Sequence, residues 1–149
     1  MIGVFRRGRS GGRADVVLAL WRVSDPGNVG TLLRSADAFG AGVMLSEGCA
    51  DPFGPKGLRA AMGSTFRVPL LEFDLPADSV ALVPDGGVPL AALGEHSTFV
   101  LGSERDGLPR ELVARCAVEA TIPVQDVDSL NVAMAGTIAL YERRRRTGV

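Results

Sequence analysis

The sequence contains a single histidine, His96, and only two cysteines, Cys49 and Cys116. The cysteines are isolated and match no metal-ligand spacing, and one histidine cannot complete a Cys/His cluster. A Ser/His/Asp triad would have to be built on His96, next to an expected strand start. These shortages argue against zinc-dependent and triad-based chemistry, and we expect reduced thiols and no metal site.

Long hydrophobic runs and familiar nucleotide motifs are also missing. No run of about 18 apolar residues occurs, and no signal peptide is recognisable. There is no Gly-x-Gly-x-x-Gly after a strand and no Gly-x-x-x-x-Gly-Lys-Ser/Thr. The sequence therefore favours a cytoplasmic protein and disfavours the ordinary Rossmann and P-loop nucleotide-binding folds.

The composition is that of one globular domain, with an uneven distribution of charge. The 149 residues are 46% hydrophobic, enough for a single core, and the net charge is −1. Residues 14–142 hold 8 basic and 17 acidic side chains, a net of −9, whereas both ends are rich in arginine. Such clusters suit phosphate backbones, and a solubilising tail is the competing interpretation. We expect a flexible basic segment, 1–13, and one domain, 14–149. The terminal arginines are Arg6, Arg7, Arg9 and Arg13, and Arg143, Arg144, Arg145 and Arg146.

Short apolar strands alternate with helix-like segments along the chain. This order predicts an α/β fold with a mostly parallel sheet flanked by helices. The expected strands are 16–23, 43–46, 67–71, 80–83, 98–101 and 118–122, and the expected helices are 26–39, 55–62, 109–115 and 129–145.

The segment 125–135 combines polar side chains with the start of a helix. Ser129 is a good N-cap, and Asp128 places negative charge at the positive helix end. Residues 130–140 are apolar nearly all round, which predicts a buried helix with Asn131 alone among apolar neighbours. A buried amide needs partners, from a ligand or from nearby backbone. Alternatively, Ser129 only caps the helix and Asn131 only bonds a neighbouring loop.

The segment 25–40 is predicted to be a helix that follows the first strand. Asp25 with Pro26 marks its start, Gly40 marks its end, and apolar residues recur at helical spacing between them. Arg34 falls opposite the apolar stripe and projects away from the core. A solvated surface arginine is the competing interpretation, and Asn28 in the first turn could equally be a cap.

The segment 99–109 is an apolar strand that runs into an acidic loop flanked by glycines. Gly102 and Gly107 allow backbone to approach a ligand closely. Glu104 follows the strand's carboxyl end, where open α/β sheets usually bind their ligands, and is a candidate acceptor or base. An ordinary polar loop is the alternative.

Together these three segments resemble the three motifs of the SpoU/TrmH family of RNA ribose 2′-O-methyltransferases, part of the SPOUT superfamily. The resemblance spans residue 16 to about residue 145 and includes the connecting segment 55–64. Two positions depart from the family pattern, Ala133 where a second serine is common and Arg105 where a glycine follows the glutamate. The matching residues are Asn28, Gly30, Arg34, Ala38, Phe39 and Gly40, then Gly102, Glu104 and Gly107, then Ile122, Pro123, Ser129, Leu130, Asn131 and Val132.

The resemblance implies a fold, a cofactor and a reaction. It implies a C-terminal trefoil knot, S-adenosylmethionine as cofactor, ribosomal or transfer RNA as substrate, and a homodimer whose active site draws on two chains. By the same resemblance, the cofactor lies against Gly102, Ile122, Leu130 and Asn131, and the catalytic residues are Arg34, Asn28, Glu104, Ser129 and Asn131.

Chemistry constrains the role that the resemblance implies for Arg34. A guanidinium is protonated throughout the accessible pH range and is a poor base. We therefore expect Arg34 to position the RNA phosphate and to stabilise the developing alkoxide, while a phosphate oxygen, Glu104 or water takes the proton. Two rivals remain: a non-catalytic RNA-binding module with the same fold, and a methyltransferase with another acceptor.

Overall fold

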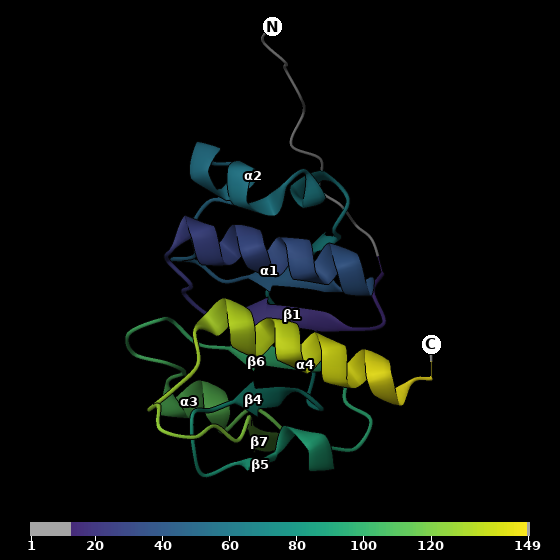
Figure 1. The fold of residues 1–149 in the computed structure, drawn as a ribbon, viewed down its shortest axis with the longest axis vertical. Helices are drawn as coiled ribbons and strands as arrows, with labels where there is room; N and C mark the ends of the chain where they lie inside the picture. Colours follow the sequence, from purple (N-terminus) through teal and green to yellow (C-terminus); the bar gives the residue numbers. More distant parts are fainter. Residues whose placement is uncertain (1–12, 149) are drawn as a thin grey trace, which may run out of the picture.

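A seven-stranded parallel sheet forms the centre of the molecule (Figure 1). The computed structural model describes residues 13–148. The strand order is β3-β2-β1-β6-β4-β7-β5, and every pair is parallel. The strands are β1 (Val17–Leu20), β2 (Gly42–Leu45), β3 (Leu70–Leu71), β4 (Val80–Leu82), β5 (Val88–Pro89), β6 (Thr98–Leu101) and β7 (Val118–Thr121). The predicted parallel α/β architecture is confirmed. Except for Arg13, the expected basic segment 1–13 lies outside the described residues.

Helices cover the two faces of the sheet unequally. Helices α1 and α4 contact each other across one face, and α2 packs beside α1 (Figure 1). Leu112 of α3 packs on the opposite face, with residues such as Ala19 and Val100. The helices are α1 (Pro26–Phe39), α2 (Pro55–Ala61), α3 (Arg110–Val113) and α4 (Val132–Arg146), with short 3₁₀ turns η1 (Ser64–Phe66) and η2 (Leu90–Ala92).

The central strand β1 shows why the sheet is parallel and buried. All four of its residues are buried. Leu18 and Leu20 join the core beneath α1 and α4, and Val17 and Ala19 join the core on the other face. Side chains alternate between faces along a strand, so a strand covered on both sides needs a continuous apolar run.

Helix α1 begins and packs for reasons that the sequence contains. The Asp25 carboxylate caps it by accepting from the Asn28 N–H at 2.9 Å, and Gly40 ends it in the left-handed region at φ 69°. A Cβ built on Gly30 would lie 2.5 Å from the Gly57 carbonyl oxygen. The absence of a side chain at Gly30 therefore lets α2 pack directly against α1.

Several predicted boundaries were wrong. The first strand ends at Leu20, because the chain then turns at Arg22, whose φ is 52°. The expected strand 67–71 is reduced to Leu70–Leu71 by the preceding turn η1, and the two-residue strand β5 was not predicted. Helix α4 begins at Val132 rather than at 129, because Asn131 caps it.

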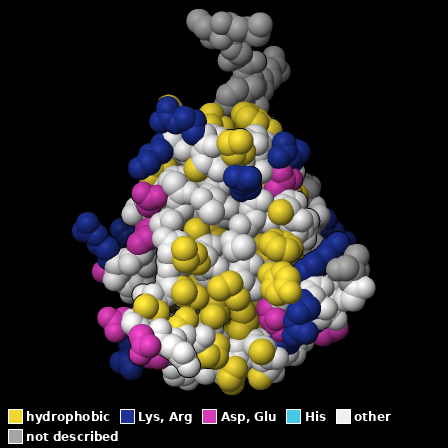
Figure 2. All heavy atoms as spheres, viewed as in Figure 1, with side chains coloured by type: hydrophobic (Ala, Val, Ile, Leu, Met, Phe, Trp, Pro, Cys, Tyr) yellow, Lys and Arg dark blue, Asp and Glu magenta, His cyan; other side chains and the backbone are white. Residues whose placement is uncertain are grey.

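The expectation that α4 is buried nearly all round was also wrong. Met134, Ile138 and Tyr141 are 60%, 37% and 56% exposed, and their spacing of four and three residues places them on one side of the helix. Figure 2 shows hydrophobic side chains clustered on the face that carries α4. The helix therefore presents an apolar stripe, Met134–Ile138–Tyr141, to its surroundings.

The knot that the resemblance implies stays a prediction. Between β7 and α4, residues 122–131 return along the carboxyl ends of the central strands and line a cavity there. Among the described residues, no helix is long and apolar enough to cross a membrane, and no group of three or more potential metal ligands occurs.

Candidate active site

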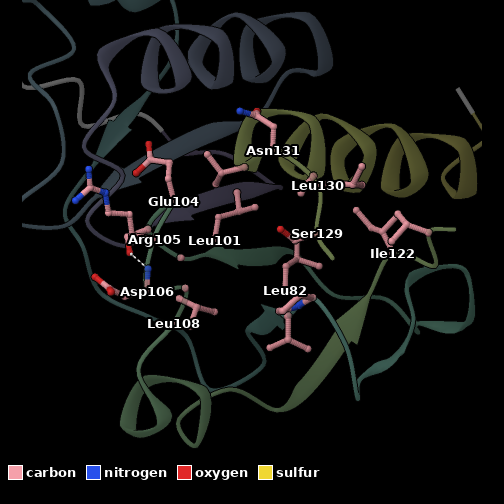
Figure 3. Close-up of a pocket in the computed structure, with 18 residues that line it drawn as sticks. Leu82, Leu101, Glu104, Arg105, Asp106, Leu108, Ile122, Ser129, Leu130 and Asn131 are labelled. Atoms are coloured by element: carbon pink, nitrogen blue, oxygen red, sulfur yellow. Dashed lines mark hydrogen bonds between the residues drawn. The ribbon is translucent and has the colours of Figure 1, made fainter. Parts of the chain in front are cut away.

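A cavity of about 530 Å³ lies at the carboxyl ends of β4, β6 and β7 (Figure 3). Open α/β sheets bind their ligands at this edge. Its walls are apolar, its rim is polar and exposed, and its residues come from β4, β6 and β7 and the segments that follow them. The wall includes Leu82, Leu101, Leu108, Ile122 and Leu130, and the rim includes Glu104, Arg105, Asp106, Ser129 and Asn131.

Most of the residues predicted for the site meet in this cavity. All four predicted cofactor-contact residues, Gly102, Ile122, Leu130 and Asn131, line it. Glu104 and Ser129 also line it, whereas Asn28 and Arg34 do not. Six of the eight predicted site residues therefore lie together in one cavity, Asn28 and Arg34 lie outside its lining, and the roles of all eight stay predictions.

Asn28 nonetheless belongs to the rim through a chain of hydrogen bonds. The Asn131 Nδ2 donates to Asn28 Oδ1 at 3.1 Å, and the Asn28 Nδ2 donates to Glu104 Oε1 at 3.1 Å. Asn28 lies in the first turn of α1, Glu104 lies in the loop after β6, and Asn131 immediately precedes α4. The chain of amides and carboxylate therefore joins the three predicted motifs into one structure.

Glu104 is the centre of this network. Its carboxylate also accepts from the Asp25 N–H at 3.1 Å and from the Ser24 N–H at 3.2 Å, with the Ser24 hydroxyl at 3.4 Å. Partial burial raises the pKa of Glu104, but hydrogen bonds from the Asn28 amide and from nearby backbone N–H groups outweigh it, so the pKa falls below its usual value. An ionised carboxylate with its lone pairs in use is a poor proton acceptor. The structure thus favours an organising role for Glu104 over the role of base.

Replacing Glu104 with glutamine is expected to give a pH-dependent loss of stability. The folded pKa lies below the unfolded value, so the carboxylate stabilises the fold fully above about pH 4.5 and progressively less as the pH falls through that value. Urea unfolding from pH 3 to 8 should show the wild type more stable than Glu104→Gln at neutral pH, with the difference shrinking below about pH 4.5. A difference that is constant with pH would contradict the ionised network.

Asn131, rather than Ser129, is the N-cap of α4. Its side-chain oxygen accepts from the N–H groups of Ala133 at 2.8 Å and Met134 at 3.3 Å. Asn131 is exposed, so the prediction of a buried amide was wrong. Ser129 is exposed at the rim and makes no hydrogen bond within the part of the chain that the structure describes. Its hydroxyl is therefore available to a ligand.

Two substitutions separate the two functions of Asn131. Asn131→Ala removes the cap and should lower the free energy of unfolding by about 1 kcal/mol. Asn131→Asp keeps an acceptor at the positive helix end, but it cannot donate to Asn28. We expect Asp to preserve most of the stability in urea unfolding while breaking the hydrogen bond between motifs. Equal destabilisation by Ala and Asp would show that the cap contributes little.

Arg34 lies where the helical spacing placed it, on the outward side of α1. It is exposed and forms no hydrogen bond or ion pair with any residue from 13 to 148. On one side of it, the Ser35 and Thr137 hydroxyls are 2.7 Å apart and join α1 to α4. On the other, Asp37 binds Ser64 and Arg67. Arg34 therefore lies on the side of α1 between its contacts with α4 and its contacts with residues 64–67.

Gly102 was predicted to let backbone approach a ligand closely, but its missing side chain is needed first for the closure of its own loop. A Cβ on Gly102 would lie 2.2 Å from the Gly107 carbonyl carbon and 2.5 Å from the Leu108 nitrogen. The loop closes on itself here, with the Ser103 N–H donating to the Gly107 oxygen at 3.2 Å and the Gly107 N–H donating back at 3.1 Å. The glycine is required by this tight loop, which in turn shapes the cavity wall.

The sequence reasoning missed the part of the cavity that follows β4. Leu82, Val83 and Pro84 line it, although only the strand was predicted there. The sequence could have indicated these residues, because they end a predicted strand and the carboxyl ends of neighbouring parallel strands lie at one edge of a sheet. Strand order was needed to place β4 next to β6, and the sequence does not specify it.

A parallel sheet with a cavity at the carboxyl ends of its central strands, rimmed by hydrogen-bonded loops, defines a ligand-binding α/β domain. The chain belongs to the SpoU rRNA Methylase family, whose model matches residues 15–141. The resemblance seen in the sequence is thereby confirmed.

Named relatives and solved structures agree with this membership. The chain is 35% identical over 145 residues to the 23S rRNA (guanosine(2553)-2′-O)-methyltransferase RlmP of Bacillus subtilis, covering 88% of this chain and 58% of the relative. An AdoMet-bound rRNA methyltransferase from Sinorhizobium meliloti superposes with a TM-score of 0.81 at 36% identity, covering 89% of this chain and 56% of that one. The SpoU methyltransferase AviRb from Streptomyces viridochromogenes, in complex with AdoMet, gives a TM-score of 0.83 at 29% identity over 93% and 63% of the two chains. This chain spans about half the length of the curated relatives it matches.

Proposed function

We propose that this protein transfers a methyl group from S-adenosylmethionine to a ribose 2′-hydroxyl of ribosomal or transfer RNA, in the cytoplasm. The observation that carries the proposal is the hydrogen-bond chain Asn131–Asn28–Glu104, which assembles the three family motifs at the rim of one cavity. The relatives' names support the reaction, since RlmP is named as a 2′-O-methyltransferase.

The cavity suits the cofactor in size and chemistry. A volume of about 530 Å³ is in the range of small-molecule sites, and apolar walls with a polar rim suit a nucleoside that carries a short polar chain through a sulfonium. Gly102, Ile122, Leu130 and Asn131 would hold S-adenosylmethionine, which supplies an electrophilic methyl group when bound. The solved relatives from Sinorhizobium meliloti and Streptomyces viridochromogenes are described with AdoMet.

The polar residues around the cavity orient the substrate hydroxyl and stabilise the charge that develops on it. Orientation of the 2′-hydroxyl accounts for much of the rate, and the Ser129 hydroxyl and the Asn131 amide at the rim are suited to it. Glu104 keeps the rim in shape by binding Ser24, Asp25 and Asn28. Its lowered pKa favours a phosphate oxygen or water as the proton acceptor. Arg34 binds the RNA phosphate and stabilises the developing alkoxide.

The position of Arg34 favours a site shared between two copies of the chain. Arg34 does not line the cavity of its own chain, and the apolar stripe Met134–Ile138–Tyr141 on α4 is exposed in the isolated chain. A homodimer that buries this stripe would bring α1 of one copy towards the cavity of the other. Exposed apolar patches of this kind mark protein interfaces.

Mixing two inactive variants tests the shared site. Arg34→Ala and Gly102→Ala should each be inactive alone, but co-expressed subunits should regain part of the activity, because one of the two sites is then intact. Sedimentation should give a dimer at micromolar concentration. A monomer, or a mixture without activity, would show that each chain carries a complete site.

The first experiment for the proposed function is calorimetric titration with S-adenosylmethionine, followed by methyl transfer to total cellular RNA. Binding together with a 2′-O-methylated nucleoside among the digestion products would support the reaction. If the cofactor does not bind, RNA binding by the same preparation, measured on filters, would favour the rival, a non-catalytic RNA-binding module. A methylated base would identify a different acceptor.

A further inference from the structure

Arg22, in the loop between β1 and α1, has an unusual backbone conformation. Its φ is 52°, in the left-handed region that residues other than glycine, asparagine and aspartate rarely adopt. Its N–H donates to the Ser46 hydroxyl at 2.9 Å, which ties this loop to the end of β2. Glycine would adopt the same turn without strain. The arginine side chain at this position therefore calls for a separate explanation.

The fold makes little use of the Arg22 side chain. Arg22 is exposed, and its guanidinium forms no hydrogen bond or ion pair with any residue in the described range 13–148. The side chain lies over Gly48, where an added Cβ would be 3.2 Å from the Arg22 Nε and 3.4 Å from its Cγ. Gly48 thus leaves room for the Arg22 side chain. That side chain packs against Gly48, but its charge has no partner among the described residues.

The backbone of Arg22 lies close to the rim of the cavity, and its side chain extends from there over the loop that follows β2. The preceding residue, Trp21, donates its N–H to the Leu101 oxygen at 2.8 Å, next to Gly102. Two residues after Arg22, the Ser24 N–H donates to Glu104 at 3.2 Å. Two residues span at most about 7 Å, so the Arg22 Cα lies within that distance of Ser24. Asp25, the nearest acidic residue along the chain, has Lys56 as its partner at 3.9 Å.

We propose that Arg22 positions the substrate by binding a phosphate of the RNA strand where that strand leaves the cavity rim and passes over the loop after β2. The assignment rests on the proposed function, since it requires RNA at this rim. An exposed guanidinium with no carboxylate partner fits a phosphate in charge and in hydrogen-bond geometry. Phosphate contacts of this kind fix the register of a nucleic acid strand without reading its sequence.

The test compares RNA binding by Arg22→Gly, Arg22→Lys and the control Arg115→Ala. Arg115 is exposed beyond α3, and its loss changes the net charge equally. The probe is 23S ribosomal RNA transcribed in vitro, bound to the full chain on filters at several salt concentrations. Arg22→Gly should weaken binding about three- to tenfold and reduce the slope of log affinity against log salt by about one. Lysine should restore part of the affinity, and Arg115→Ala should match the wild type.

Two further measurements distinguish the possible failures. S-adenosylmethionine affinity should be unchanged in Arg22→Gly, and its melting temperature should not fall, because glycine relieves the strained φ. If the wild type binds RNA and Arg22→Gly behaves as Arg115→Ala does, the Arg22 assignment is wrong and the proposed function stands. If the wild type binds S-adenosylmethionine but not RNA, the RNA substrate is wrong, and Arg22 loses its role with it.

Discussion

Replacing Arg34 with lysine is expected to lower the rate of methyl transfer by about 10²-fold or more. Lysine keeps the charge but loses the planar fork that holds a phosphate and the developing alkoxide together. Arg34 is exposed and projects from α1 without a partner in residues 13–148, so its replacement should leave the fold intact. The measurement is single-turnover methyl transfer to RNA at saturating S-adenosylmethionine.

Two controls make the Arg34 result specific. Cofactor affinity, measured by calorimetry, should be the same for Arg34→Lys and the wild type, because Arg34 does not line the cavity. Arg110→Lys, at an exposed position in α3 on the other face of the sheet, should retain full activity. Near-normal turnover of Arg34→Lys would refute a role that depends on guanidinium geometry.

Gly102→Ala is expected to weaken S-adenosylmethionine binding by about 100-fold or more, a loss of about 2.7 kcal/mol. The new Cβ would lie 2.2 Å from the Gly107 carbonyl carbon, and that atom belongs to backbone that cannot rotate away as a side chain would. The loop 103–108 must therefore open, and it forms one wall of the cavity. Overpacking of this kind also costs about 1–3 kcal/mol of stability.

Gly94→Ala is the matched control for Gly102→Ala. A Cβ on Gly94 meets nothing within 4 Å, and Gly94 is not among the residues that line the cavity. It should bind the cofactor with wild-type affinity, while circular dichroism confirms that both variants are folded at the assay temperature. Wild-type affinity in Gly102→Ala would show that the tight loop is not part of the cofactor site.

The layers of the fold could be predicted because buried strands and helices have a recognisable spacing of apolar residues in the sequence. A continuous apolar run such as 17–20 predicts a central parallel strand, and the stripe in 26–39 predicts a helix on one face. Short edge elements leave no such pattern. Strand β5 contains only Val88 and Pro89, both exposed, so neither burial nor periodicity marks it.

The candidate site was predicted in position but only in part in detail. Gly102 and Glu104 were singled out because they follow a strand's carboxyl end, and Asn131 because it is a lone amide among apolar residues; their roles stay predictions. The cap was assigned to Ser129 instead of Asn131 because both residue types cap helices and they lie two positions apart. Apolar residues of α4 were predicted to be buried because an apolar pattern alone does not distinguish a core face from an exposed apolar face.

The pairing of β1 with β6 has a consequence for how the chain acquires its structure. Val17 pairs with Thr98, and the bond from Asn131 to Asn28 joins residues 103 positions apart. Forming contacts so distant along the chain first costs the entropy of closing a large loop, and the favourable energy of the contact comes only afterwards. Proteins dominated by such contacts fold slowly. During synthesis, β1 can pair with β2 early, but its pairing with β6 requires residue 98 and beyond, and the bond to Asn28 requires Asn131. The rim of the cavity therefore requires the whole span from Asn28 to Asn131, and no shorter N-terminal piece of the chain contains its hydrogen bonds.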